Sequence, residues 1–273
     1  MTETSTADDL APKVWEALTE LAADAYRRSP VLGATLRRSI LGCGSLGQAL
    51  ARLLGDAMTG FVPKGVDVER IAAQALRLDP GIVDRAAADL AKLEAVNPAC
   101  PDLLAGFLSF RGFQALQWYR VGHAIWNSGD QQLAALLQNW GAMKFAMDIH
   151  PAARIGKAVF FDHGIGLVVG STSVIEDGVN MWHGVTLGST LTQAGDRHPK
   201  VRANATICAG ATILGNIEVG PGAIVAAASV VLRSVPAGAV VAGIPARVTG
   251  KAPERLHAID EDFKLESAQA QEA

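Results

Sequence analysis

The sequence predicts an α+β chain in which an all-helical N-terminal domain precedes a left-handed parallel β-helix of hexapeptide repeats. Apolar residues recur at steps of three and four as far as Met147, but every six residues between Ile149 and Gly250. Charge also nearly vanishes in residues 201–250, which hold only Arg202, Glu218, Arg233 and Arg247. We therefore expect a helical domain at 1–147, a β-helix domain at 148–250 and a C-terminal tail at 251–273.

The helical domain is predicted from apolar spacing. In the first segment the periodic positions are Val14, Leu18, Leu21 and Ala25. Pro12 suits a first helical turn, and Ser29-Pro30 ends the pattern. Similar patterns cover residues 31–58, broken at 42–44, and then 66–78, 82–95, 102–126 and 131–147. No segment alternates in twos for long, so we interpret this part as entirely helical.

The β-helix is predicted by aliphatic residues on a six-residue lattice. The lattice positions are Val169, Ile175, Met181, Leu187, Val201, Ile207, Ile213, Val219, Val225 and Val231. Upstream, Ile155, Phe161 and Leu167 keep the same step, with a two-residue slip before Val169. Three hexads make one triangular coil, so residues about 18 apart stack on neighbouring coils roughly 4.8 Å apart. An ordinary helix or sandwich would instead show a period of 3.6 or 2.

One segment leaves this lattice. Residues 189–200 break the repeat and contain the sequence Gly-Asp-Arg-His-Pro-Lys at 195–200. The coils themselves are stiff and uniform, so an excursion loop is where binding chemistry is expected.

Composition excludes several classes of protein. The chain has 273 residues, 49% apolar and 19% charged, which argues against disorder. The 24 basic and 27 acidic residues give a net charge of -3, so we expect neither nucleic acid nor a membrane as partner. The three cysteines are scattered, the N-terminus is unlike a signal peptide, and the sequence has no apolar run of about 18 residues. These features predict a cytoplasmic protein.

A histidine and an aspartate are the candidates for catalysis. His163 stands where the lattice expects small or aliphatic residues, and Asp148 precedes it by slightly less than one coil. The two side chains can therefore face each other, and a carboxylate on one imidazole nitrogen leaves the other free as a base. The sequence contains neither a nucleophile elbow nor a Cys beside a His, and either of these would indicate a covalent intermediate. Direct transfer of an acyl group to an alcohol is therefore the simpler mechanism.

Several motifs carry a resemblance to a known family. They are Asp-Ile-His-Pro-Ala-Ala-Arg-Ile-Gly at 148–156, Phe-Asp-His-Gly at 161–164, Val-Thr-Leu-Gly at 185–188, Gly-Asp-Arg-His-Pro-Lys at 195–200 and Ala-Gly-Ile-Pro-Ala-Arg at 242–247. With Gly-Phe-Gln-Ala-Leu-Gln at 112–117, they resemble the serine O-acetyltransferase family. The resemblance implies acetyl transfer from acetyl-CoA, as co-substrate, to L-serine in cysteine biosynthesis, with no metal.

The resemblance also implies roles for the acceptor-site residues. His163 would be the general base and Asp148 its partner. Asp162 would bind the substrate ammonium and Arg197 its carboxylate, with His198 beside them, and both charges suit these roles. Asn97 stands where the family usually has an aspartate that helps to hold the ammonium.

For acetyl-CoA, the resemblance implies that backbone near Gly188, Ser189, Ala209 and Gly210 lines the arm of the cofactor. Arg247 and Lys251 are the candidates for its 3′-phosphate. It further implies a homo-oligomer, a trimer or a dimer of trimers. The chain ends in Gln271-Glu272-Ala273 and not in the family's isoleucine, so we do not expect a complex with the next enzyme of the pathway.

Three other functions stay open from the sequence. Asn97 allows the same acetyl transfer to another hydroxy-amino acid, such as homoserine. A zinc hydratase of the carbonic anhydrase type would need three convergent histidines, for which the candidates are His163, His183 and His198. A non-catalytic scaffold is the third, and the retained Asp148 and His163 argue against it.

Overall fold

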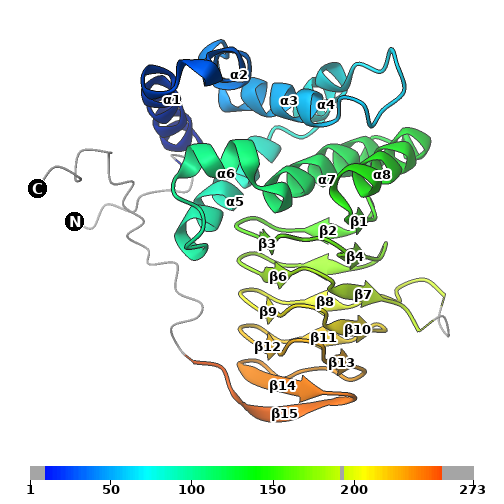
Figure 1. The fold of residues 1–273 in the computed structure, drawn as a ribbon. Coiled ribbons are helices and arrows are strands. Elements are labelled where there is room, and N and C mark those ends of the chain that lie inside the picture. Colours follow the sequence, from blue (N-terminus) through cyan, green and yellow to red (C-terminus); the bar gives the residue numbers. More distant parts are fainter. Residues whose placement is uncertain (1–9, 191–193, 254–273) are drawn as a thin grey trace, which may run out of the picture.

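The computed structural model describes residues 10–190 and 194–253, with a layer of helices on one end of a stack of β-coils (Figure 1). The helices are α1 (Leu10–Arg28), α2 (Gly33–Leu36), α3 (Leu46–Ala57), α4 (Val68–Leu78), α5 (Ile82–Val96), α6 (Leu103–Ser109), α7 (Arg111–Asn127) and α8 (Gln131–Phe145). A 3₁₀ turn (Pro30–Leu32) and a π-helical turn (Arg37–Leu41) join α1, α2 and α3. In the described residues, no helix is long and apolar enough to cross a bilayer.

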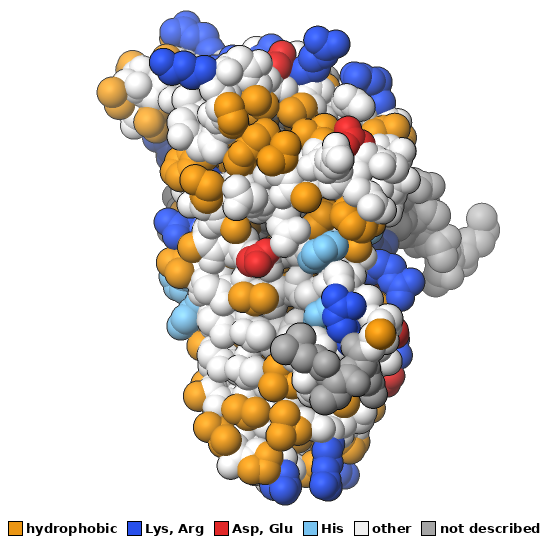
Figure 2. Space-filling model, turned by 90° about the vertical axis from the view of Figure 1, so that its right-hand side faces the viewer, with side chains coloured by type: hydrophobic (Ala, Val, Ile, Leu, Met, Phe, Trp, Pro, Cys, Tyr) orange, Lys and Arg blue, Asp and Glu red, His pale blue; other side chains and the backbone are white. Residues whose placement is uncertain are grey.

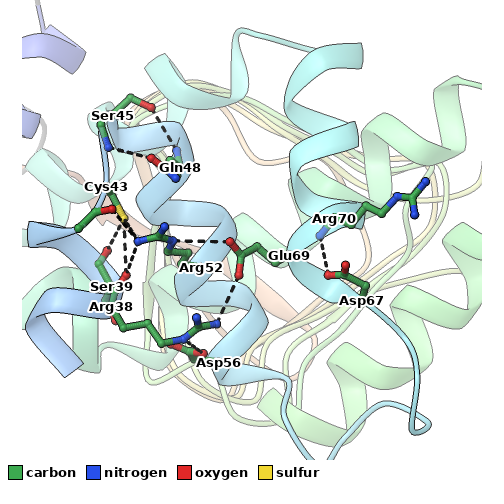
Figure 3. A network of polar contacts seen from close by, with 12 residues as sticks. Arg38, Ser39, Cys43, Ser45, Gln48, Arg52, Asp56, Asp67, Glu69 and Arg70 are labelled. Carbon is green, nitrogen blue, oxygen red and sulfur yellow. Dashed lines mark hydrogen bonds and ion pairs between the residues drawn. The ribbon is translucent and has the colours of Figure 1, made fainter. Parts of the chain in front are cut away.

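Polar side chains fix where four of these helices begin. Ser45, Asp67, Asp102 and Asp130 each accept a hydrogen bond from the backbone N–H three residues ahead, at the N-termini of α3, α4, α6 and α8. Two of these caps are drawn in Figure 3, beside a surface network. There Arg52 donates to the carbonyl oxygens of Arg38 and Gly42 and pairs with Glu69 at 3.6 Å, which ties the π-helical turn to α4.

The coils consist of short parallel strands. They are β1 (Asp148–Ile149), β2 (Arg154–Ile155), β3 (Phe160–Asp162), β4 (Val168–Val169), β5 (Val174–Ile175), β6 (Asn180–Trp182), β7 (Thr186–Gly188), β8 (Lys200–Val201), β9 (Thr206–Ile207), β10 (Thr212–Leu214), β11 (Glu218–Val219), β12 (Ile224–Val225), β13 (Val230–Val231), β14 (Ala239–Gly243) and β15 (Ala246–Lys251). The strand orders are β1-β4-β7-β10-β13, β11-β8-β5-β2 and β15-β14-β12-β9-β6-β3. Three sheets thus form the faces of a triangular prism, and β14 and β15 close it as an antiparallel pair.

The six-residue lattice is confirmed as the core of the prism. All ten lattice positions from Val169 to Val231 are at most 2% exposed. Their stacking follows from the register, which pairs Val169 with Leu187, Leu187 with Ile213 and Ile213 with Val231. Aliphatic side chains fill this interior at close packing, and Phe161, paired with Met181, occupies the corresponding position in the first coil.

Two insertions interrupt the regular step of 18 residues between stacked strands, and one sheet illustrates both. The register pairs Asp148 with Val168 and Val168 with Thr186, and the first of these steps along the chain is two residues longer than the second. The extra pair of residues lies in the turn between β3 and β4. The next step, from Thr186 to Thr212, is longer still, because the excursion that follows β7 lies within it.

The helical layer and the first coil share a hydrophobic core. Trp118 and Phe145, from α7 and α8, belong to the same buried cluster as Ile149 and Phe161 from the coils. The Tyr119 hydroxyl donates to the carbonyl oxygen of Ala153 at 2.5 Å. The helices are therefore packed directly onto the coil that carries Asp148 and the strand that leads to His163.

Candidate active site

His163 lies in the turn between β3 and β4, where it takes a left-handed backbone conformation with φ of +53°. Gly164 and Gly166 also have positive φ. The Gly166 N–H donates to the carbonyl oxygen of Ala146 at 2.7 Å, which holds the turn against the end of α8. A non-glycine residue in this region is strained. The side chain of His163 is 73% exposed at an edge of the prism. We name this edge the His163 corner (residues 162–166).

The surroundings of His163 differ from the expected pair with Asp148. Its Nε2 lies 3.8 Å from the carboxylate of Asp162, and its ring meets that of His183 edge-on at 6.1 Å. The Asp148 carboxylate instead accepts a hydrogen bond from Gln138 of α8 at 2.6 Å. Asp148 is nevertheless near the turn, because its neighbour Met147 packs against Gly164 so closely that a Cβ there would clash. The structure brings Asp162 and His163 together and leaves Asp148 beside them without a direct bond.

His198 lies at a second prism edge, the Arg197 corner (residues 170–172 and 194–200). It is 7% exposed and covers Gly170, where a Cβ would clash with its ring. Its Nδ1 accepts from the Thr172 N–H at 3.2 Å. Burial lowers the pKa of His198, and the nearby cations Arg197 and Lys200 lower it further. Both effects favour the neutral form of the imidazole.

Arg197 is oriented by the backbone of the same corner. Its guanidinium donates to the Gly195 carbonyl oxygen at 3.2 Å and to Ser171 Oγ at 3.3 Å. Thr172 Oγ1 accepts from the backbone N–H groups of both Arg197 and His198. A guanidinium has five N–H donors, and among the described residues these bonds use two. Arg197 can thus still bind a carboxylate.

His150 lies near two of the candidate groups, Asp148 and Arg197, although the sequence analysis did not single it out. Burial lowers the pKa of His150, the charge of Asp148 opposes this shift, and the charge of Arg197 adds to it. Its ring meets Trp126 edge-on at 5.2 Å, and its Nδ1 accepts from the Ala152 N–H. The signal was its position two residues after Asp148 within the quoted motif.

The two corners are separated by the sheet that contains β4 and β7. Figure 2, which views the side of β7 and its loop, shows histidine side chains in two places, at the left edge and right of the centre of the coils. The residues from Leu167 to Gly170 span the sheet between the corners, a distance of roughly 10 Å at the rise of a strand. A single chain therefore does not bring Asp162 and His163 against Arg197 and His198.

The residues expected to line acetyl-CoA are similarly divided. Gly210 lies below the His163 corner, stacked between Gly184 and Ala228, all three with positive φ. Ala209 belongs to this column because its carbonyl oxygen accepts from the Ala228 N–H. Gly188 ends β7 on the opposite side of the sheet, with Ser189 after it. Arg247 and Lys251 lie on the exposed strand β15.

Asn97 has a local structural role. It ends α5, and its side-chain oxygen accepts from the Ala99 N–H at 3.0 Å. Asp102 caps α6 by accepting from the Ala105 N–H at 2.7 Å. Burial raises the pKa of nearby Glu94, and the charge of Asp102 raises it further. In the described parts of the chain, no three His, Cys, Asp or Glu side chains converge as metal ligands.

Comparisons with known proteins agree with the expected family. Residues 14–118 match the family model described as serine acetyltransferase, N-terminal. The chain is 43% identical to a putative serine acetyltransferase of Schizosaccharomyces pombe, over 92% of this chain and 93% of that protein. It is 40% identical to the serine acetyltransferase of Escherichia coli K12, over 91% of each.

Solved structures give the same result. The serine acetyltransferase of Brucella abortus in complex with coenzyme A aligns with a TM-score of 0.85 at 39% identity, covering 90% of this chain and 98% of that one. A serine acetyltransferase in complex with cysteine aligns at 0.85 and 42% identity, covering 88% and 94%. The predicted fold, helices followed by a left-handed β-helix, is thereby confirmed. With relatives at 40% identity or more over nine-tenths of both chains, the protein belongs to the serine acetyltransferase family.

Proposed function

We propose that the protein transfers the acetyl group of acetyl-CoA to the hydroxyl of L-serine, which gives O-acetylserine and free CoA. The observation that carries this proposal is the exposed histidine on a strained turn, in a chain whose relatives are serine acetyltransferases. A solved relative with coenzyme A bound supports the co-substrate. The relatives do not favour homoserine transfer or a zinc hydratase.

In the proposed mechanism His163 takes the proton of the serine hydroxyl as the oxygen attacks the thioester carbonyl carbon. The tetrahedral intermediate then collapses, the C–S bond breaks, and the proton passes from the imidazolium to the departing CoA sulfur. Asp148 supports the imidazolium, and Asp162 binds the serine ammonium. General base catalysis of this kind contributes typically 10²–10⁴-fold in rate. The exposure of His163 and the carboxylate 3.8 Å from its Nε2 support this assignment.

We propose that each complete site is shared by two protomers of a homotrimer, or of a dimer of trimers. The His163 corner of one protomer would face the Arg197 corner of its neighbour. The separation of the two corners by a whole sheet supports this arrangement. Ile165 and Val168, 50% and 39% exposed on this side, give such an interface apolar area.

A mixing experiment tests the shared site. His163→Ala and Arg197→Ala should each be inactive when expressed alone. Coexpression of the two variants in equal amounts should restore about a quarter of the wild-type sites in a closed ring. Each site needs an intact His163 from one protomer and an intact Arg197 from its neighbour, and about half of the protomers carry each of these residues intact. If mass measurements show that mixed trimers form and no activity returns, the proposal that two protomers share each site is contradicted.

The CoA arm would lie along the column that contains Ala209 and Gly210 and reach Gly188 and Ser189 of a neighbour. Arg247 and Lys251 would bind the 3′-phosphate. The division at 1–147, 148–250 and 251–273 and a cytoplasmic location are retained as proposals, the latter supported by scattered cysteines that are free in the structure.

Release of CoA from acetyl-CoA across a panel of hydroxy-amino acids tests the activity directly. We expect the highest kcat/KM with L-serine and a lower value with L-homoserine. A protein that releases CoA faster with homoserine than with serine would overturn the assigned acceptor. His163→Ala serves as the control for background hydrolysis.

A further inference from the structure

The strand that leads to His163 has an edge that no other strand pairs with in the described part of the chain. β3 is the last strand of its sheet and pairs only with β6. The Phe160 N–H points to β6, where it donates to the Val179 carbonyl oxygen at 3.0 Å. Because alternate residues of a strand point their polar groups to opposite edges, Val159 N–H and Phe161 C=O face away from the coils. Figure 1 places α5 and α7 above this edge.

A buried ion pair holds the first of these groups. Asp89 of α5 is 1% exposed and accepts from the Val159 N–H at 3.0 Å. Its other oxygen accepts from Arg120 of α7 at 2.6 Å, and Arg120 donates onward to the Gly156 carbonyl oxygen at 2.7 Å. One carboxylate thus joins two helices to the backbone that enters β3.

A glycine of α7 contacts the second group. A Cβ at Gly112 would clash with the carbonyl oxygen of Phe161 and lie 2.9 Å from its carbonyl carbon, closer than real Cβ atoms approach. The atoms it would meet are backbone, so any side chain at this position must displace either the helix or the strand, by on the order of 1 Å. Asp162 and His163 follow Phe161 directly.

We propose that Gly112 and the Asp89–Arg120 pair are positioning residues for acetyl transfer. The helical layer sets the place of β3 through these contacts, and β3 sets the place of Asp162 and His163. This inference rests on the proposed function, because it assigns the general base to His163. It adds that the geometry of the base is controlled from residues 112, 89 and 120, all of which are buried in the helical layer.

Three alanine variants separate this role from general stability. Gly112→Ala introduces the clash with β3. Gly141→Ala introduces a clash with Trp118, whose Cδ1 and Nε1 would lie 2.5 and 2.7 Å away, in the packing of α7 against α8. Gly122→Ala, also on α7, meets nothing closer than 3.9 Å. The three changes are chemically the same and differ in what the added methyl group meets.

We expect Gly112→Ala to lower kcat by about 10²-fold, the cost of misplacing a catalytic group by about 1 Å, with KM for acetyl-CoA within about twofold of wild type. Gly141→Ala should lose at least as much Tm but keep kcat within about threefold, and Gly122→Ala should change neither. Should Gly112→Ala not fold, Asp89→Asn keeps the shape and weakens the hold on β3, and its kcat should fall about tenfold.

Two results would overturn the proposal. One is a folded Gly112→Ala, or in its absence a folded Asp89→Asn, with wild-type kcat. The other is a fall in kcat in both Gly112→Ala and Gly141→Ala that is proportional to the fall in Tm of each variant. Wild-type protein that releases no CoA with serine would contradict the proposed function itself, which a change confined to the variants would not.

Discussion

The helical layer and the coils bury their residues by different rules. In the coils the same lattice position is buried in every hexad, and Val, Ile, Leu and Met all occur there. In the helical layer the buried set includes Trp118, Tyr119 and an ion pair between Asp89 and Arg120, both at most 2% exposed. Each coil repeats the one below, whereas each helical contact is made once. The coils therefore supply a regular support, and the helices supply particular contacts to the strand that leads to His163.

The largest expected effect isolates the chemistry from both regions. His163→Ala should lower kcat by about 10²–10⁴-fold, because the proton of the serine hydroxyl then has no acceptor in place. The free energy of unfolding should stay within about 0.5 kcal/mol of wild type, since the side chain is 73% exposed. Steady-state assays and urea denaturation measure the two quantities. Retention of more than about a tenth of the turnover would contradict the assignment of the base.

The second prediction concerns the ion pair of the helical layer. Asp89→Ala should destabilise the protein by about 3–5 kcal/mol, because it leaves the buried Arg120 without a counter-charge. The matched control is Asp56→Ala, since Asp56 also lies 2.6 Å from an arginine, Arg38, but on the surface (Figure 3). That change should cost less than about 1 kcal/mol. Equal losses in urea denaturation would contradict the distinction between the two pairs.

The third prediction concerns the lattice of the coils. Ile213 is fully buried and stacked between Leu187 and Val231. Ile213→Ala should lower the free energy of unfolding by about 2–5 kcal/mol, because a cavity remains between rigid coils. Ile213→Val should cost only about 0.5–1.5 kcal/mol, since Val already fills equivalent positions. If both changes cost the same, the lattice positions are not interchangeable.

The same contrast explains what the sequence could predict. Burial in the coils follows from a local period, so every lattice residue could be named without knowing its partners. The contact of Asp89 with Arg120 and Val159 joins residues 31 and 70 apart, and no local pattern reveals it. The expected pairing of Asp148 with His163 was argued from a separation close to one coil, and sequence separation alone does not fix where either side chain points. The first coil is longer by the extra pair of residues, which sets Asp148 opposite Val168 and its carboxylate against Gln138. His150 was missed because burial beside Trp126 depends on packing between α7 and the first coil.

The smallest expected effect lies in the helical layer, at Asn97. Asn97→Asp should lower KM for serine about fivefold, because a charge-assisted hydrogen bond to the ammonium exceeds a neutral one by about 1 kcal/mol. The fold should be unaffected, since an aspartate can accept from the Ala99 N–H as Asn97 does.

The gain should shrink as salt is added, because ions screen the new charge. The alternative is that Asp102, which caps α6, already supplies the carboxylate. In that case Asn97→Asp leaves KM unchanged and Asp102→Asn raises it, while the amide oxygen preserves the cap. A third outcome is that neither change alters KM for serine but one of them alters KM for homoserine. That result would show that this end of the helical layer selects a longer acceptor than serine.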